Sequence, residues 1–354
     1  MNEWLSSVGA EAAVLVTVAI VDGSGPREAG AHMLVTAGRQ FDTIGGGHLE
    51  MRAVDIGRSM LKSGQPVRME RFALGPSLGQ CCGGVVHLAF DLVDSGLAEV
   101  LSTLRQRRGE DCWRLSAIDG PAASALFDAT GALVAGTHAT SAPDAMPPFA
   151  RERGTHVMRD AAGRRWLVDA CPAPRAHLLL FGAGHVGAAL VRTLGELPCT
   201  VTWIDERDAM FPAIVPANVT VEASDTPEAL VADAPPDSSY LVMTHSHALD
   251  QRLSEAILGR ADVGWFGLIG SKTKRMQFEH RMRARSVPEE RIAAMVCPIG
   301  LPGIANKAPA VIATSVCAQL LMVWEAQQAA ATWPAAEQPA VREAPPLRAI
   351  RRTS

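Results

Sequence analysis

A glycine-rich turn between an apolar strand candidate and an apolar helix candidate constrains the fold of this chain most strongly. Residues 182–187 read Gly-Ala-Gly-His-Val-Gly, a G-x-G-x-x-G pattern. In such a turn Gly182 permits the sharp bend, Gly184 lets a pyrophosphate approach, and Gly187 lets the helix pack closely. Asp205 ends the next strand candidate, where it can accept a hydrogen bond from a ribose hydroxyl. These residues predict a Rossmann-type unit. Its nucleotide site is either functional, or it is vestigial or serves another ligand.

The pattern of strand and helix candidates changes twice along the chain. From residue 173 to residue 325, strand and helix candidates alternate at the spacing of βαβ units. Residues 1–107 instead mix strand candidates with turns and one or two helices, and residues 108–172 hold short strand candidates joined by Asp- and Gly-containing turns. The expected fold is α/β: an N-terminal α+β domain, a short antiparallel β meander or linker, and a C-terminal Rossmann-like parallel domain. Residues 326–354 are rich in Ala, Pro, Glu and Arg, and we expect a disordered tail there.

Composition narrows the classes of partner. The chain has 33 basic and 37 acidic residues, a net charge of -4, and only 5% aromatic residues with a single Tyr. These values argue against a nucleic-acid partner. No signal peptide is expected at the start, and the apolar run over residues 12–21 is too short to span a bilayer. We therefore expect a cytoplasmic protein with reduced thiols and no membrane partner.

A pair of adjacent cysteines between glycines is the most distinctive chemical motif. Residues 79–84 read Gly-Gln-Cys-Cys-Gly-Gly. Adjacent cysteines rarely pair with each other, because a vicinal disulfide strains the peptide between them. Flanking glycines leave the thiols little covered, which suits a soft or metal-containing ligand. The alternative is a tight turn that enters a buried strand with two small apolar side chains.

Two further glycine loops lie in the same domain. Residues 23–27 read Gly-Ser-Gly-Pro-Arg, and Gly45, Gly46 and Gly47 precede a helix candidate over residues 48–63. Backbone amides before a helix are donors for a phosphate, and Arg27 can form bidentate bonds to the same group. Glu50, in the first turn of that helix, favours the helix dipole but opposes an anion. The alternative is a glycine turn with a surface ion pair.

Two strand ends in the C-terminal half carry polar groups. His245, His247 and Asp250 follow one strand candidate and are residue types that bind metals. Alternatively, Asp250 caps the next helix and one histidine orients a backbone carbonyl. At a later strand end, Ser271 and Lys272 open a basic helix, which is either an anion site or a solvated helix face. No C-x-x-C pair occurs, so a structural zinc site is not expected.

In this order, the motifs resemble the XdhC/CoxI family, the accessory proteins that serve xanthine dehydrogenase and related molybdenum hydroxylases. The resemblance rests on Gly23-Ser24-x-Pro26-Arg27-x-x-Gly30-Ala31, Ile44-Gly45-Gly46-Gly47-x-x-Glu50, Gly79-Gln80-Cys81-Cys82-Gly83-Gly84, Gly182-Ala183-Gly184-His185-Val186-Gly187, Thr244-His245-x-His247-x-x-Asp250, Gly270-Ser271-x-x-Lys274-Arg275 and Cys297-Pro298-Ile299-Gly300. It covers about residues 10–95 and 175–323.

The resemblance implies a carrier of the molybdenum cofactor (molybdopterin) rather than an enzyme. Such a protein protects the cofactor during sulfuration and inserts it into apo xanthine dehydrogenase. The molybdenum-binding subunit of that enzyme, a cysteine desulfurase (sulfurase) and a second copy of the chain are the implied partners.

Candidate site residues follow from the motifs themselves together with this resemblance. A thiolate suits molybdenum bound to a dithiolene, and Cys82 is the first choice for that contact. The other residues expected around the cofactor are Gln80, Cys81, Gly83, Gly84, Arg27, Gly45, Gly46, Gly47 and Glu50. NAD(P) or another nucleotide is expected at Gly182, Gly184, Gly187, Asp205, Ser271 and Lys272. Two rival functions remain open: an NAD(P)-dependent oxidoreductase that uses the Rossmann domain, and a metal-dependent hydrolase that uses His245, His247 and Asp250.

Overall fold

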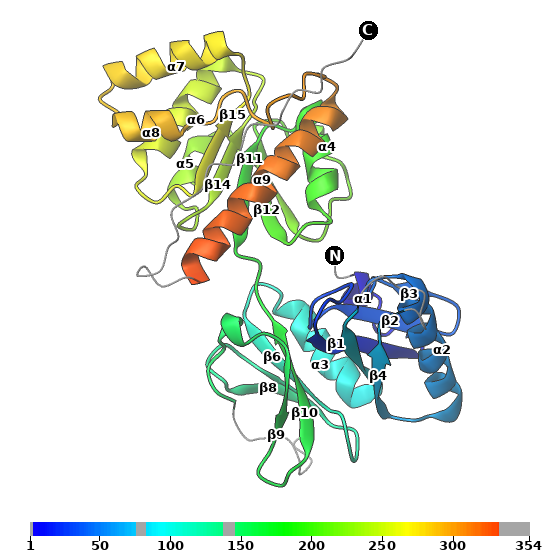
Figure 1. Cartoon of the computed structure of the whole chain (residues 1–354). Helices are drawn as coiled ribbons and strands as arrows, with labels where there is room; N and C mark the ends of the chain where they lie inside the picture. The colour runs from blue at the N-terminus through cyan, green and yellow to red at the C-terminus, as the bar shows by residue number, and fades with distance from the viewer. Residues whose placement is uncertain (1–2, 76–82, 137–145, 333–354) are drawn as a thin grey trace. The chain divides into compact units, whose positions relative to one another are not determined.

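The protein consists of two compact units, shown in the computed structural model of Figure 1. The structure describes residues 3–75, 83–136 and 146–332. The first unit comprises residues 1–177 with 195–200, and the second comprises residues 178–194 with 201–354. The boundary expected at residue 107 therefore falls inside the first unit.

The first unit begins with a five-stranded antiparallel sheet in the order β3-β2-β1-β5-β4. Its elements are α1 (Glu3–Ser6), β1 (Ala13–Asp22), β2 (His32–Thr36), β3 (Gln40–Phe41), α2 (Gly47–Ser63), β4 (Val67–Ala73), β5 (Val85–Leu92) and α3 (Ser95–Gln106). Alternate residues of β1 point to opposite faces. Val14 and Val16 pack with Leu49 of α2, whereas Leu15 packs with Leu101 of α3. A helix thus covers each face of the sheet.

The second sheet of this unit is the expected antiparallel meander, in the order β8-β7-β6-β10-β9. Its elements are β6 (Cys112–Ala117), β7 (Ser124–Phe127), β8 (Leu133–Gly136), η2 (Arg151–Arg153), β9 (His156–Arg159) and β10 (Arg165–Cys171). Leu97 and Leu104 of α3 share one buried cluster with Leu15 of the first sheet and Leu126 of the second. Because α3 packs against both sheets, the meander is part of a common core rather than a linker.

A buried ionic network joins the two sheets. The Arg114 side chain is fully buried, and its Nε donates to Asp169 Oδ2 at 3.0 Å while its Nη2 donates to Thr17 Oγ1 at 3.1 Å. Burial acts to raise the pKa of Asp169, but the charges of His32 and Arg114 outweigh it and hold that pKa well below its usual range. Burial raises the pKa of Asp91, which also lies beside Arg114, to about 6.

The second unit contains the expected parallel sheet, in the order β13-β12-β11-β14-β15. Its elements are β11 (Ala176–Phe181), α4 (His185–Leu194), β12 (Cys199–Asp205), η3 (Asp208–Met210), β13 (Val219–Ala223), α5 (Pro227–Ala232), β14 (Ser239–Val242), α6 (His247–Gly259), β15 (Trp265–Leu268), α7 (Lys272–Ala284), α8 (Glu289–Ala294) and α9 (Pro309–Thr332). From the central strand β11 the chain adds β12 and β13 on one side of the sheet, and it then adds β14 and β15 on the other side. In α/β sheets this switch point, at the carboxyl ends of the strands, is where ligands bind. The predicted fold class is confirmed.

Helices cover both faces of the parallel sheet. Figure 1 shows α4 and α9 side by side, with α5 to α8 gathered elsewhere around the sheet. Phe181 and Val242 of the strands pack with Leu253 of α6, Phe278 of α7 and Ile292 of α8 in one buried cluster.

Helix α9 differs from the sequence expectation. The composition predicts a disordered tail from residue 326, but the helix continues through Thr332. The residues that extend it include four alanines, the strongest helix formers. By length and composition α9 would also suffice to cross a membrane, and about a third of its apolar window is buried within the protein. The expected tail beyond Thr332 lies outside the described residues.

Candidate functional site

The glycine loops of the first unit meet at one end of its first sheet. Gly84 precedes β5, and a side chain there would lie 2.6 Å from the carbonyl oxygen of Asp22 and clash with that of Ser24. Gly45 has a φ of +117°, and a Cβ on it would lie 2.5 Å from Pro26 Cβ. Only glycine fits at either position. The loop that follows β1 therefore contacts both the loop before α2 and the loop before β5.

The segment that holds the cysteine pair joins β4 to β5 in the sequence. Gln80, Cys81 and Cys82 lie outside the described residues, whereas Gly83 and Gly84 lie within them. The backbone N–H of Leu74, just after β4, donates to the carbonyl oxygen of Gly84 at 2.8 Å. The described residues on both sides of the cysteine segment are thus fixed beside the loop after β1.

The amides of the glycine triplet are partly engaged within the protein. Glu50 Oε2 accepts hydrogen bonds from the N–H groups of Gly46 at 3.1 Å and Ile44 at 3.2 Å, and from the Thr43 hydroxyl. The N–H of Gly45 donates to Thr43 Oγ1 at 3.0 Å. A carboxylate of the chain itself thus occupies part of the position where we expected a phosphate.

Arg27 lies across two of the loops. Its Nη1 donates to the carbonyl oxygen of Thr43 at 3.3 Å, and its Nη2 contacts Glu28 Oε1 at 3.0 Å. The hydrogen bond from Arg27 lowers the pKa of Glu28. The Arg27 side chain is 28% exposed, so part of the guanidinium faces solvent at this corner.

The Rossmann glycines have the expected steric roles. Gly182 has a φ of +118°, and a side chain there would clash with the carbonyl oxygen of Met243. A side chain at Gly187 would clash with the carbonyl oxygen of Gly182. A Cβ at Gly184, in contrast, would meet nothing within 4 Å. The first and third glycines pack against the protein, whereas the second borders open space.

Asp205 has a different role from the one that its spacing predicts. Its Oδ2 accepts from the N–H of Ala183 at 2.7 Å and from Arg207 Nη2 at 3.0 Å, and its Oδ1 accepts from Arg207 Nε at 2.8 Å. Although burial opposes the shift, the hydrogen bonds from Arg207 and Ala183 lower the pKa of Asp205. Both carboxylate oxygens therefore hold the glycine turn and an arginine.

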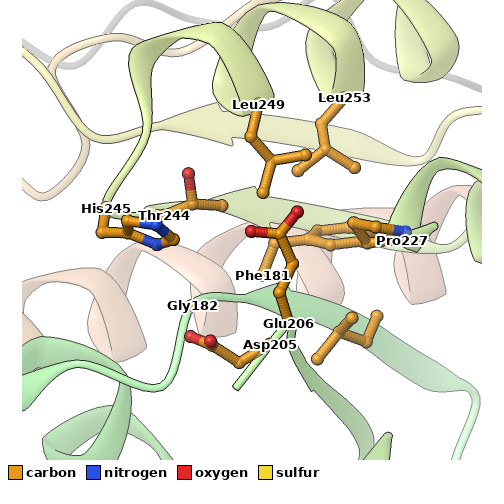
Figure 2. Close-up of a pocket in the computed structure, with 10 residues that line it drawn as sticks. Phe181, Gly182, Asp205, Glu206, Pro227, Thr244, His245, Leu249 and Leu253 are labelled. Carbon is orange, nitrogen blue, oxygen red and sulfur yellow. The ribbon is translucent and has the colours of Figure 1, made fainter. Parts of the chain in front are cut away.

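A narrow cavity lies at the switch point (Figure 2). Phe181, Glu206 and His245 are among the residues that line it, and Figure 2 shows Leu249 and Leu253 closing it from α6. Its volume of about 10 Å³ has room for about one water molecule. The side of the switch point next to β12 is therefore nearly filled by side chains.

A larger cavity, of about 320 Å³, opens at the carboxyl ends of β14 and β15. The residues that line it are Thr244, His245, His247, Asp250, Ile269, Gly270, Ser271 and Lys274. The structure therefore brings together the histidine motif and the Ser271 motif, which the sequence presented as separate sites. Lys274, rather than the expected Lys272, is the lysine that lines this cavity.

The side chains of the histidine motif do not gather as metal ligands in this structure. Asp250 Oδ1 accepts from the Thr244 hydroxyl at 2.7 Å, and its Oδ2 pairs with Lys274 Nζ at 2.6 Å. Within the described ranges, the structure contains no group of three or more His, Cys, Asp or Glu side chains that could hold a metal ion. Thr244 and Lys274 engage both carboxylate oxygens of Asp250, so Asp250 does not join His245 and His247 as a metal ligand.

Comparisons with known proteins agree with this architecture. A family model described as the XdhC and CoxI family matches residues 9–73, and one described as the XdhC Rossmann domain matches residues 178–320. A protein of Bacillus subtilis that is described as a probable subunit of xanthine dehydrogenase is 25% identical over 328 residues, 88% of this chain and 93% of the relative. The uncharacterized protein YqeB of Escherichia coli is 30% identical over 181 residues. That match spans 49% of this chain and 32% of YqeB.

A solved structure shares the fold. The crystal structure of a protein described as a xanthine dehydrogenase from Bacillus halodurans matches with a TM-score of 0.71 and 21% identity, over 93% of this chain and 96% of that one. The two family models match in the order that the motifs require, and together they cover more than half of the chain. This chain belongs to the XdhC and CoxI family.

Proposed function

We propose that this protein serves the maturation of a xanthine dehydrogenase or a related molybdenum hydroxylase, as a carrier of the molybdenum cofactor. It binds the molybdopterin form, protects it while its terminal sulfur is installed, and inserts it into the apo-enzyme. Membership of the family and the likeness to a probable subunit of xanthine dehydrogenase support this role. The protein acts in the cytoplasm, where thiols stay reduced.

The convergence of three glycine loops carries the proposal. Gly84 is packed against Asp22 and Ser24, so the chain that follows Cys82 is fixed beside the Arg27 loop. A soft molybdenum–dithiolene centre favours a thiolate ligand, and Cys82 directly precedes Gly83 and Gly84 in the sequence. The described residues of this corner add a partly exposed cation, Arg27.

The phosphate of the pterin is assigned to Arg27 in preference to the glycine triplet. The Glu50 carboxylate already accepts from the amides of Ile44 and Gly46, and it would repel a second anion. Arg27 has guanidinium donors for a phosphate, and it is held in place by Thr43 and Glu28. Glu50 therefore shapes the corner instead of binding the phosphate.

Replacement of the thiol tests the proposal. Cys82→Ala is expected to reduce the molybdenum content of protein purified from cofactor-producing cells about tenfold, a loss of about 1.4 kcal/mol in binding. Cys171→Ala is the matched control, because Cys171 is partly exposed on β10 and is not part of the glycine loops. Equal molybdenum content in wild type and Cys82→Ala would rule out the assigned thiol.

Delivery requires partners, which the proposal names. The carrier meets the molybdenum-binding subunit of the apo-enzyme and receives sulfur through a cysteine desulfurase, and it acts as a homodimer. Co-purification of the tagged chain with each partner, compared between cofactor-producing and cofactor-deficient cells, tests this assignment. A cofactor carrier should retain the apo-enzyme better when it is loaded.

A nucleotide-dependent oxidoreductase is the second candidate function. The strand order and the open space at Gly184 favour a nucleotide, such as NAD(P), at the glycine turn. Against it, both oxygens of Asp205 are already engaged, and the neighbouring cavity is nearly filled. An assay of NADH and NADPH oxidation with the purified protein separates the candidates, because a carrier turns over neither.

A further inference from the structure

The cavity at the ends of β14 and β15 is a second site, distant in sequence from the glycine loops of the first unit. We call it the Lys274 pocket and define it by the residues Thr244, His245, His247, Asp250, Ile269, Gly270, Ser271 and Lys274. Its volume of about 320 Å³ exceeds that of a single small ion and lies at the lower end for small-molecule sites.

A buried cation lies at the wall of this pocket. The Lys274 side chain is 11% exposed, and its Nζ donates to Asp250 Oδ2 at 2.6 Å and to the carbonyl oxygen of Ile269 at 2.8 Å. An ammonium group has three protons. Within the described residues these two bonds are its hydrogen bonds, and the Nζ also lies 5.3 Å from the centroid of the Phe278 ring. One N–H therefore has no hydrogen-bond acceptor among the described residues and can donate to a ligand.

Two helices add positive potential to the same space. Ser246 and Ser271 are the N-caps of α6 and α7, where their hydroxyls accept from the N–H groups of Leu249 and Lys274. Each helix has 13 residues, and its other first-turn amides, such as those of Ala248 and Thr273, have no intrahelical acceptor. Both N-termini therefore favour an anion in the pocket.

The charge balance of the pocket favours an anion over a metal ion. Asp250 is its one carboxylate among the lining residues, and Lys274 neutralises it. His245 and His247 are exposed at the rim and add ring N–H donors. A metal cation would meet Lys274 where it needs a free carboxylate.

We propose that the Lys274 pocket binds a phosphate ester, an inference that goes beyond cofactor carriage. Lys274 and the Ser271 end of α7 bind the phosphoryl group, and the remaining volume takes the organic part. Thr244 and His245 line both this pocket and the narrow cavity that Gly182 borders. The organic part therefore extends from the phosphoryl group toward the glycine turn.

Calorimetric titration of the full-length protein with AMP, ribose 5-phosphate and inorganic phosphate tests the proposal. At least one ester is expected to bind about tenfold more tightly than inorganic phosphate, because it also fills the pocket. The double variant Asp250→Asn/Lys274→Gln removes both charges of the pair, so it leaves no isolated buried ion. It is expected to weaken ester binding about tenfold.

Arg281→Gln is the control outside the pocket, because Arg281 is exposed on the same helix and does not line the pocket. It should change ester affinity by less than about twofold. His247→Ala, at the exposed rim, provides a second variant that should fold normally and weaken ester binding about threefold.

Molybdenum content and ester binding distinguish failure of the cofactor-carrier proposal from failure of the pocket proposal. The molybdenum content of the double variant should equal that of wild type, since the proposed cofactor site lies in the first unit. Absence of binding by all three probes up to about 10 mM, about 2.7 kcal/mol of binding free energy, would overturn the pocket assignment. Equal losses in the double variant and in Arg281→Gln would overturn it as well, because a residue outside the pocket would then matter as much as the ion pair that lines it.

Discussion

Two glycine-rich turns of this protein, at residues 45–47 and 182–187, are each held by an acidic side chain of the chain itself. The two acids differ in how firmly they are fixed. Glu50 accepts from the amides of Ile44 and Gly46, is only partly buried, and has the Gln40 and Thr43 side chains as further partners. Asp205 is 6% exposed and is bound twice by Arg207 in addition to the Ala183 amide. The Rossmann turn is therefore held by an ion pair. The carboxylate that holds the N-terminal turn has no cationic partner within the part of the chain that the structure describes.

This difference teaches that glycine spacing alone does not reveal whether backbone donors are free. Both turns read in sequence as phosphate cradles. In each turn, an acidic residue that follows the glycines accepts hydrogen bonds from some of the backbone N–H groups. The other partners of that acid determine how readily these N–H groups become available to a ligand. Four measurements would break or sharpen the comparison.

Methyl groups added to the Rossmann turn should have the largest effect. Gly187→Ala places a Cβ against the carbonyl oxygen of Gly182, so it should lower the free energy of unfolding by about 3 kcal/mol. Gly184→Ala faces open space and should change it by less than about 0.5 kcal/mol. Urea unfolding followed by circular dichroism compares the two, and equal losses would contradict the packing described for this turn.

Loss of the locked acid should have the next largest effect. Asp205→Ala leaves the buried amide of Ala183 and the guanidinium of Arg207 without their acceptor, so it should destabilise the protein by about 2 kcal/mol. The same unfolding experiment measures it. A loss below that of the corresponding change at Glu50 would reverse the comparison.

The weaker acid provides that matched variant. Glu50→Ala removes an acceptor from a partly exposed loop, where water can replace it, so the expected loss in the free energy of unfolding is about 1 kcal/mol. Glu50→Gln keeps one acceptor and removes the charge. It should bind inorganic pyrophosphate more tightly than wild type by about threefold, because the internal anion is gone. Weaker binding would show that Glu50 helps the anion to bind.

The smallest expected effect is a difference between acidic residues in how their contribution to the free energy of unfolding depends on pH. Burial raises the pKa of Asp91, in the first unit, to about 6, so its protonated form stabilises the fold at low pH and this contribution is lost as pH rises through 6. Stability attributable to Asp91 should fall by about 1 kcal/mol between pH 5 and pH 8. Asp169 and Asp205 have lowered pKa values, so their contributions are lost only as pH falls below the ordinary aspartate range. Asp91→Asn should abolish the loss between pH 5 and pH 8 in denaturant titrations, and persistence of that loss would assign it to another group.

Much of the Rossmann architecture was predictable because its signals are local. The roles expected of Gly182 and Gly187 depend on a strand, a turn and a helix that are contiguous in the chain, and the structure shows both glycines in tight contacts. The overall composition of residues 326–354 does not predict the extension of α9 to Thr332. Its first residues are alanine-rich and continue the helix before the prolines begin.

The partners of the charged groups could not be predicted, because they depend on packing. Lys274 lines the pocket and Lys272 does not, and this follows from the rotation of α7 relative to α6, where Asp250 lies. Arg114 reaches Thr17 across 97 residues of sequence, so no local pattern announces that bond. Arg207 had an available signal, since an arginine two residues after a strand-end aspartate can fold back on it.

The molybdenum content of the wild-type protein, purified without oxygen from cells that make the cofactor, tests the central claim most directly. A carrier that uses the N-terminal corner should retain about one molybdenum and one pterin per chain, as a soft metal centre held by a thiolate would. Protein that emerges folded but without molybdenum and without pterin, even from such cells, would contradict cofactor carriage.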